Sequence, residues 1–306
     1  MATYLVTQAT GQQSQWVITQ LIASGVRINA VVRNLSKIPP ILQHTSVTLF
    51  EGESTDYNVI YHAAQGCEAV FLNTFPVPGL EIQQASTVVK ASKDAGVRSI
   101  VLSSAASANK REYWDDEYVK QLGMQWYFAA KFEVEKLVRD AGFESYTILR
   151  PAWIIHDFFL PAARFNFPNL ATKGEIDHAY DEGIKSSYTD CFDIGRYAAA
   201  ALQDPVKFKN EEIDLGGELL TIEEVRDILA RVSGREVTAR KRTDKEIEGA
   251  TFAKLSQGFQ LLVSKKPLED DKESVRAVQK KFGIAFTSLE DALRRDVKRL
   301  LDTLPA

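Results

Sequence analysis

Short apolar runs alternate with longer helix-forming stretches through the first 150 residues, and this alternation restricts the chain to few folds. Each run has the length of a buried strand and is followed by polar or turn-forming residues. We predict strands at Tyr4–Thr7, Ile28–Val32, Val47–Phe50, Ala69–Leu72, Ser99–Ser103 and Tyr146–Leu149. We predict helices at 13–23, Tyr57–Gln65, 81–95 and 124–140. Apolar strands separated by helices form a parallel sheet covered on both faces, so the sequence predicts a doubly wound α/β fold.

The pattern changes after residue 152, because residues 153–192 are rich in aromatic side chains and lack a clear period. Thr221 and Glu224 have the spacing of a capping box, and Gly234 is placed to end the helix that they begin. Beyond the aromatic stretch we predict a strand at Ile213–Leu215 and helices at Asp193–Leu202, Thr221–Val232 and 288–302.

The chain has 306 residues, of which 45% are hydrophobic, and this is enough apolar material for two lobes. We expect a first domain of residues 1–152 that contains the parallel sheet. A smaller C-terminal α/β lobe of residues 153–306 follows, with some of the chain crossing back to the sheet.

The charge and the cysteine content exclude several classes of protein. The net charge of −4 argues against a general nucleic-acid or anionic-membrane surface. Cys67 and Cys191 are far apart, which supports neither a disulfide framework nor a cysteine metal site, and no histidine pair has metal-ligand spacing. No apolar run reaches the roughly 18 residues of a membrane span. We expect a cytoplasmic protein that acts on a small molecule and binds neither nucleic acid nor membrane; its oligomeric state stays open.

The segment from Thr7 to Ser14 joins the first predicted strand to the first helix, where parallel-sheet proteins bind a pyrophosphate. Gly11 is the one glycine here, and Gln8 and Ser14 occupy positions where the usual fingerprint has glycine. If Gln8 must adopt the left-handed backbone conformation that glycine adopts freely, this conformation costs about 1–2 kcal/mol. The alternative is an ordinary turn without a ligand. The predicted phosphate-binding residues are Thr7, Ala9, Thr10, Gly11, Gln12 and Gln13.

Two cations follow the second strand, where the adenosine ribose of a bound dinucleotide would lie. Arg33 and Lys37 suit the 2′-phosphate of NADP, whereas an acidic residue would suit the free hydroxyl of NAD. The alternative is that both are solvated loop charges. Asn73 and Thr74 end the fourth strand beside the expected cofactor, although residues there are often only turn formers.

Several stretches resemble the NmrA-like family, the atypical branch of the short-chain dehydrogenase superfamily. The turn T-Q-A-T-G-Q-Q-S is similar to the family's T-G-A-T-G-x-Q-G. Further similar stretches are Val32-Arg33-Asn34 running on to Lys37, Lys131 followed by Glu133 and Glu135, Tyr146–Arg150 leading into Pro151, and Asp193–Arg196. The resemblance runs from Thr7 to around Val237. It implies a Rossmann lobe that binds NAD(P), with Pro151 against the carboxamide, and a smaller lobe that closes over a substrate. The family includes reductases and regulators that sense the dinucleotide.

Tyr127 and Lys131 have the Y-x-x-x-K spacing, which places both side chains on one helical face. Hydride reduction of a carbonyl or imine requires a proton at the heteroatom, and a neighbouring ammonium makes a tyrosine a better partner for it. The superfamily places a serine at the end of the fifth strand to orient the substrate. Ser103 and Ser104 both lie there, and Ser104 is the better match of the two. Lys131 would also bind the nicotinamide ribose. The alternative is a packed aromatic face on this helix.

These observations predict an NADP-dependent oxidoreductase that reduces a carbonyl or imine of a largely apolar small molecule, of the kind found in specialised metabolism. The alternatives are an NAD(P)H-sensing regulator without catalysis and a cofactor-assisted, non-redox cyclase or isomerase. Candidates for the lining of the substrate pocket are Trp153, His156, Phe158 and Tyr188, although most of them would equally serve as core.

Overall fold

The computed structural model describes residues 1–250, 254–268 and 271–306, and they form two compact units. The first unit comprises residues 1–114, 126–151 and 191–215. The second comprises residues 115–125, 152–190 and 216–306. The segment that returns to the first unit is therefore 191–215.

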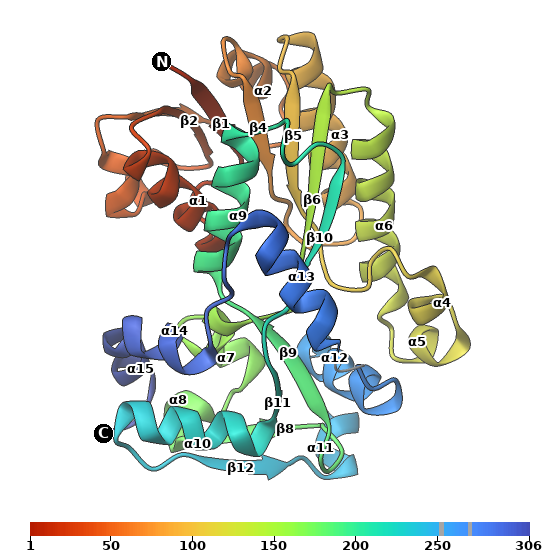
Figure 1. The fold of residues 1–306 in the computed structure, drawn as a ribbon. Helices are drawn as coiled ribbons and strands as arrows, with labels where there is room; N and C mark the ends of the chain where they lie inside the picture. Colours follow the sequence, from red (N-terminus) through yellow and green to blue (C-terminus); the bar gives the residue numbers. More distant parts are fainter. Residues whose placement is uncertain (251–253, 269–270) are drawn as a thin grey trace. The chain divides into compact units, whose positions relative to one another are not determined.

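The first unit is built on a parallel sheet, which the described residues form from seven strands in the order β10-β6-β5-β4-β1-β2-β3 (Figure 1). The strands are β1 (Thr3–Val6), β2 (Arg27–Val32), β3 (Val47–Glu51), β4 (Ala69–Leu72), β5 (Ser99–Ser103), β6 (Ser145–Pro151) and β10 (Glu211–Leu215). The predicted doubly wound α/β fold is confirmed. The order reverses between β1 and β4, and ligands of such sheets bind at the carboxyl ends of the strands beside this reversal.

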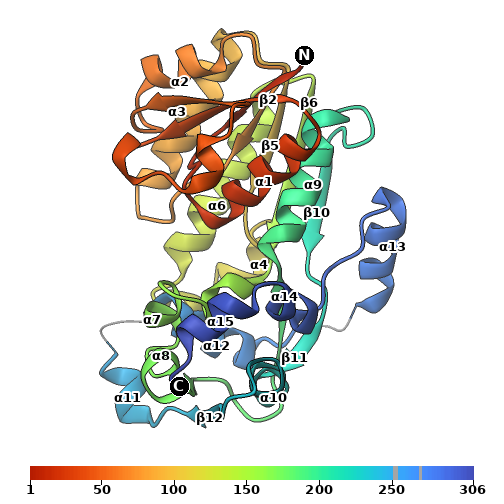
Figure 2. The same cartoon turned by 90° about the vertical axis from the view of Figure 1, so that its left-hand side faces the viewer.

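Helices cover both faces of this sheet. The helices of this unit are α1 (Gln12–Ala23), α2 (Tyr57–Ala64), α3 (Leu80–Asp94), α6 (Gln125–Asp140) and α9 (Cys191–Gln203), together with the short α4 (Arg111–Trp114), which lies away from the sheet (Figure 1). Ile60 of α2, Val88 of α3 and Val134 of α6 belong to one buried cluster with Leu102 of β5, so these three helices share one face. The other face carries α1 and α9, which lie side by side (Figures 1 and 2).

The contact between α1 and α9 depends on one glycine. A Cβ atom at Gly195 of α9 would lie 2.7 Å from the carbonyl carbon and 2.8 Å from the carbonyl oxygen of Trp16. The backbone of α1 therefore approaches α9 more closely than any side chain at position 195 allows. Because α1 begins at the loop after β1, this contact also fixes the predicted nucleotide-binding turn.

The second unit contains two small sheets, β11-β9-β7 and β12-β8, among the described residues. Its strands are β7 (Trp153–Ile154), β8 (Glu175–His178), β9 (Lys185–Thr189), β11 (Leu219–Thr221) and β12 (Thr238–Lys241). Its helices are α5 (Glu117–Gln121), α7 (Ala163–Asn166), α8 (Leu170–Lys173), α10 (Ile222–Ser233), α11 (Asp244–Glu248), α12 (Lys254–Lys265), α13 (Lys272–Phe282), α14 (Leu289–Arg295) and α15 (Val297–Thr303). Phe158 and Phe167 stack at a centroid distance of 5.0 Å within its apolar core.

The predicted capping box is present, since Thr221 accepts from Glu224 N and the Glu224 side chain accepts from Thr221 N. The predicted single helix over 288–302 is wrong, because the backbone leaves helical geometry at Asp296, with φ −102° and ψ 25°. The break accompanies a bidentate pair between Arg295 and the buried Asp190. Within the described ranges, no helix combines the length and apolar character that a membrane crossing requires.

We expect Gly195→Ala to destabilise the protein. In an open helix position this change adds about 1 kcal/mol of helix stability, whereas overpacking at a rigid contact costs about 1–3 kcal/mol. Urea unfolding followed by circular dichroism should therefore show a net decrease in the free energy of unfolding. The clash is with the backbone of residue 16, so combining the change with Trp16→Ala should not restore stability. Restoration in that double variant would contradict our assignment.

Candidate functional site

The loop between β1 and α1 adopts the strained geometry that its sequence suggests. Gln8 has a φ of +49°, the left-handed conformation usually reserved for glycine. Gly11 N donates to Gln8 O over 2.8 Å, and a Cβ at Gly11 would lie 3.1 Å from that oxygen. The two residues thus form one tight turn, in which position 11 tolerates little beyond hydrogen.

Polar side chains hold this loop onto the sheet. The buried Ser14 hydroxyl donates to Thr7 O over 2.9 Å, which gives the serine at the third glycine position a structural role. The Thr7 hydroxyl accepts from Asn73 N over 3.0 Å and so joins the ends of β1 and β4. Ser103, the last residue of β5, donates to Gln13 Oε1 over 2.6 Å. Three strand ends therefore support the loop.

The first turn of α1 is suited to an anion. Gly11 is the N-cap residue of α1, and no side chain of a described residue accepts a hydrogen bond from the N–H groups of the first turn. The first turn also carries no acidic side chain. Thr10 and Gln12 are exposed, whereas Ala9 is buried and donates its N–H to Val31 O over 3.3 Å. Free N–H groups at the positive end of the helix dipole attract negative charge. The loop thus has the features of a phosphate site.

Arg33 and Lys37 are both exposed at the carboxyl end of β2, and neither has an ion pair with any described residue. Between them Asn34 accepts hydrogen bonds from the backbone N–H and hydroxyl of Ser36, which shapes the turn that carries both cations. Unpaired cations on a shaped turn remain available to a phosphate.

Tyr127 and Lys131 lie on the same face of α6, with Lys131 Nζ 5.8 Å from the centre of the Tyr127 ring. The lysine is buried and its ammonium lies 2.6 Å from Glu81 Oε1. Glu81 belongs to the first turn of α3 and is fully buried. The same Oε1 atom accepts from the hydroxyl of Thr74 over 2.6 Å. A carboxylate therefore compensates the charge of Lys131.

Ser104, which follows β5, binds a different part of α6 from the part that carries Tyr127 and Lys131. Its hydroxyl donates to Glu135 Oε1 over 2.6 Å, and both residues are buried. Glu135 follows Tyr127 by two helical turns, which is about 12 Å along the helix axis. In this structure the proton of the Ser104 hydroxyl is thus directed at Glu135 and away from the Tyr127–Lys131 face.

Glu135 is the centre of a buried ion network. Arg150 of β6 donates to both of its oxygens, over 2.8 and 2.7 Å, and Arg139 donates to Oε2 over 2.7 Å. Both arginines also bind Glu212 of β10. Hydrogen bonds from Arg139 and Arg150 lower the pKa of Glu212 to about 2, against the effect of its partial burial. The network joins α6 to two strands.

Pro151 ends β6, and its carbonyl accepts from Ala106 N over 2.9 Å. The remaining predicted residues belong to the second unit. Phe158 and Tyr188 are buried in its core, and Trp153 packs against the same cluster. His156 is also buried, and desolvation together with the nearby Arg299 lowers its pKa to about 3, so the imidazole is neutral near pH 7. Phe158 and Tyr188 therefore serve as core in this structure.

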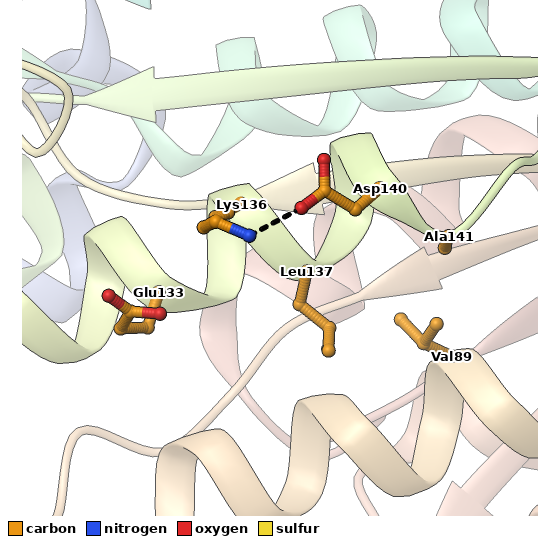
Figure 3. Close-up of a pocket in the computed structure, with 6 residues that line it drawn as sticks. All are labelled: Val89, Glu133, Lys136, Leu137, Asp140 and Ala141. Carbon is orange, nitrogen blue, oxygen red and sulfur yellow. Dashed lines mark hydrogen bonds and ion pairs between the residues drawn. The ribbon is translucent and has the colours of Figure 1, made fainter.

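Figure 3 shows the residues that line an open hollow between α3 and α6. Its lining residues are Val89, Glu133, Lys136, Leu137, Asp140 and Ala141, and Lys136 pairs with Asp140 across one helical turn. These residues belong to the C-terminal halves of the two helices. They therefore lie at the amino ends of the strands, opposite to the predicted cofactor loop.

Sequence reasoning missed Glu81, Glu135 and Arg150 as parts of the site. For Glu81 a signal existed, because it is a carboxylate in the first turn of the helix that follows Asn73 and Thr74. Glu135 and Arg150 were noted only within stretches that resemble a family. Their pairing depends on which strand lies under α6, and the local sequence does not show it.

Comparison with known proteins agrees with this architecture. The profile of the NmrA-like family matches residues 2–288. Quinone oxidoreductase 2 of Escherichia coli is 26% identical over 251 residues, which cover 80% of this chain and 79% of that protein. Agroclavine dehydrogenase of Claviceps fusiformis is 35% identical over 105 residues, about a third of either chain (34% of this one and 35% of the relative).

Solved structures share the fold. NmrA, described as a negative transcriptional regulator in complex with NAD, superposes with a TM-score of 0.77 at 20% identity and covers 99% of this chain and 98% of its own. The Escherichia coli NADPH-dependent quinone oxidoreductase in complex with NADPH gives a TM-score of 0.75 at 24% identity, covering 96% and 99%. The expectation of a nicotinamide dinucleotide agrees with these complexes.

We expect Glu135→Gln to lower the free energy of unfolding by about 3–5 kcal/mol, because it leaves Arg150 buried without its carboxylate. Urea denaturation measures the loss. Exchanging Glu135 and Arg150 together for Met should cost less than either single change, since no uncompensated charge is then buried. A double variant less stable than both single variants would contradict this view of the pair.

The stability of the network should also depend on pH. The pKa of Glu212 is lowered in the folded state, so its contribution is complete above about pH 5 and is lost as the pH falls towards 2. The difference in unfolding free energy between the unmodified protein and Glu212→Gln should therefore shrink over that range. Glu144→Gln, at an exposed carboxylate, is the matched control. An unchanging Glu212 difference would contradict the prediction.

Proposed function

The chain belongs to the NmrA-like family, and on this premise we propose that it is an NADP(H)-dependent reductase of a carbonyl or imine in a largely apolar small molecule. The observation that carries the proposal is the uncapped, acid-free start of α1 together with two unpaired cations after β2. These features fit a dinucleotide that carries a 2′-phosphate.

The residues present fit such a cofactor part by part. The backbone of residues 10–13 would hold the pyrophosphate, and Gly11 leaves room for it to approach. Arg33 and Lys37 would bind the 2′-phosphate through charge-assisted hydrogen bonds. Lys131 would reach the nicotinamide ribose, beside the ends of β4 and β6. Asn73 and Pro151 would border the nicotinamide.

Bound NADPH supplies a hydride, and the protein must then supply a proton. Tyr127 would donate that proton to the oxygen or nitrogen of the substrate, and the Lys131 ammonium beside its ring would favour the phenolate that remains. Glu81 reduces this effect because it offsets part of the lysine charge. Ser104 keeps its place with Glu135 in our proposal and supports α6, so it is left out of the substrate contacts.

The substrate class rests on the relatives. Two of them carry the names quinone oxidoreductase and agroclavine dehydrogenase, and both names denote redox chemistry on small organic molecules. Trp153, at the edge of the aromatic core of the second unit, is the residue that we would assign to substrate contact there.

A second candidate is an NADP(H) sensor without catalysis. It is favoured by the compensation of Lys131 by Glu81, which weakens the activation of Tyr127. The fold of NmrA, a regulator by description, is compatible with it. The two candidates share the cofactor site and differ in whether Tyr127 takes part in turnover.

We expect the protein to bind NADPH more tightly than NADH in calorimetric titrations. Loss of a charge-assisted hydrogen bond costs about 1.5–3 kcal/mol, so Arg33→Ala and Lys37→Ala should each weaken NADPH about 10-fold to 100-fold and leave NADH almost unchanged. Lys209→Ala, which removes an exposed cation elsewhere in the first unit, is the control. Failure of the unmodified protein to bind either dinucleotide would overturn the proposal.

Tyr127→Phe separates the reductase from the sensor. If Tyr127 donates the proton, the variant should bind NADPH normally and lose about 100-fold or more in the turnover of a quinone or imine substrate. The loss of NADPH absorbance on oxidation measures the rate. Unchanged turnover would remove Tyr127 from the mechanism, and NADPH binding without turnover of any such substrate would favour the sensor.

A further inference from the structure

The loop after β4 exposes apolar side chains to solvent. Three of the eight large apolar side chains that are exposed among the described residues fall within one short stretch, as Phe75, Val77 and Ile82. Phe75 exposes 56% of its surface, although phenylalanine is among the residues most often buried. Isolated exposed apolar side chains are ordinary, but apolar side chains gathered in one place often mark a site of interaction. The grouping points to a ligand or partner that this loop contacts.

Hydrogen bonds to α3 hold the loop in place. The buried Glu81 side chain accepts from the Thr74 hydroxyl over 2.6 Å, and the buried Gln84 side chain accepts from Phe75 N over 2.9 Å. Val77 N donates to Phe75 O over 2.8 Å, and a proline on either side of Val77 restricts the backbone further. The backbone that carries the Phe75 ring is thus restrained before any ligand arrives, which lowers the entropy cost of a contact with it.

The loop begins beside the Tyr127–Lys131 face of α6. The Glu81 Oε1 atom that binds the Thr74 hydroxyl also lies 2.6 Å from Lys131 Nζ, so residue 74 and the lysine meet at one oxygen atom. Lys131 Nζ is in turn 5.8 Å from the centre of the Tyr127 ring. The loop leaves the carboxyl end of β4, beside the reversal of strand order where ligands of such sheets bind. Phe75, which directly follows Thr74, is therefore an exposed ring next to the groups that we assign to reduction.

We propose that Phe75 is a specificity-determining residue whose ring stacks on a flat, conjugated part of the substrate, next to the carbonyl or imine that is reduced. This inference rests on the proposed function and narrows its substrate class from apolar molecules in general to those with an aromatic or conjugated ring. Aromatic pairs gain energy from offset or edge-to-face contact, which a saturated ring does not reproduce. Val77 would extend the apolar surface under the rest of the molecule.

Two other groups would also cover an exposed ring. A second copy of the chain is disfavoured, because three apolar side chains are few against the roughly 800 Å² that each partner buries in a stable interface. The nicotinamide of the cofactor is flat as well, but in our proposal Asn73 and Pro151 border it. Only contact with the substrate predicts that Phe75 discriminates between ligands of equal size while the affinity for the cofactor stays unchanged.

A matched pair of ketones tests the proposal in the protein loaded with NADP⁺, which carries no hydride and so allows binding to be measured without turnover. 1-Tetralone and 1-decalone share the same bicyclic carbon skeleton and the same ketone position, but the second ring is aromatic only in 1-tetralone. We expect calorimetric titrations of the unmodified protein to show about 3-fold to 10-fold tighter binding of 1-tetralone, which corresponds to the usual strength of an aromatic pair.

Phe75→Leu keeps an apolar side chain but removes the ring, so the preference for 1-tetralone should fall below about 2-fold while the affinity for NADP⁺ changes less than about 2-fold. Phe75→Tyr keeps the ring and should keep the preference. Val206→Ala is the control, because it alters an exposed apolar side chain in the segment before β10, at the amino edge of the sheet. Since Phe75 is exposed, circular dichroism should show an unchanged fold in each variant.

Several results overturn the inference. A preference for 1-tetralone that survives Phe75→Leu, or that is absent from the unmodified protein, would show that the ring makes no such contact. Weaker NADP⁺ binding in Phe75→Leu would assign the ring to the nicotinamide, and a changed oligomeric state in light scattering would assign it to a second copy of the chain. Binding of NADP⁺ without binding of either ketone would overturn the substrate class. Failure of the unmodified protein to bind NADP⁺ would instead overturn the proposed function, and this inference with it.

Discussion

The buried pair of Glu135 and Arg150 is the interaction on which the rest of the first unit depends. A carboxylate removed from water must find donors, and Glu135 finds them in a hydroxyl after β5, in its own helix and in β6. Glu135 can reach all of these donors only when α6 lies at one position along the sheet. The same helix carries Tyr127 and Lys131, so the network sets how far both side chains stand above the carboxyl edge. The site is therefore positioned from two turns below it.

Lys131 and Glu81 form a second buried ion pair, at the candidate site itself. The buried ammonium of Lys131 lies 2.6 Å from the Glu81 carboxylate of α3, which fixes its position. The arrangement would favour binding of the proposed cofactor, because the Lys131 donor is held in place before a ligand arrives. It favours proton transfer less, since part of the field of the lysine is already used. The same ion pair is thus compatible with both proposed functions, which differ in whether Tyr127 takes part in turnover.

Much of this could be predicted from local sequence, and the rest required the order of the strands. Apolar strands between helices gave the fold class, and the spacing of Tyr127 and Lys131 gave their shared face, because both follow from helix and strand periodicity. Glu81 lies 50 residues before Lys131 in the chain, and the two meet because β4 and β5 are neighbours in the sheet, which places α3 and α6 on the same face. The second unit was largely unpredicted, since its strands and several of its helices are too short to show a period. The break at Asp296 is next to a long-range pair between Arg295 and Asp190, which the local sequence does not show.

The return of residues 191–215 to the first unit has a consequence for synthesis of the chain. β6 pairs with β10, and α9 covers one face of the sheet beside α1. While a ribosome is still making residues 152–190, β6 is an open edge and the apolar surface under α9 is bare. Such edges invite pairing with other chains. The nascent protein is thus most exposed to aggregation between the completion of β6 and the emergence of β10, and a chaperone would act in that interval.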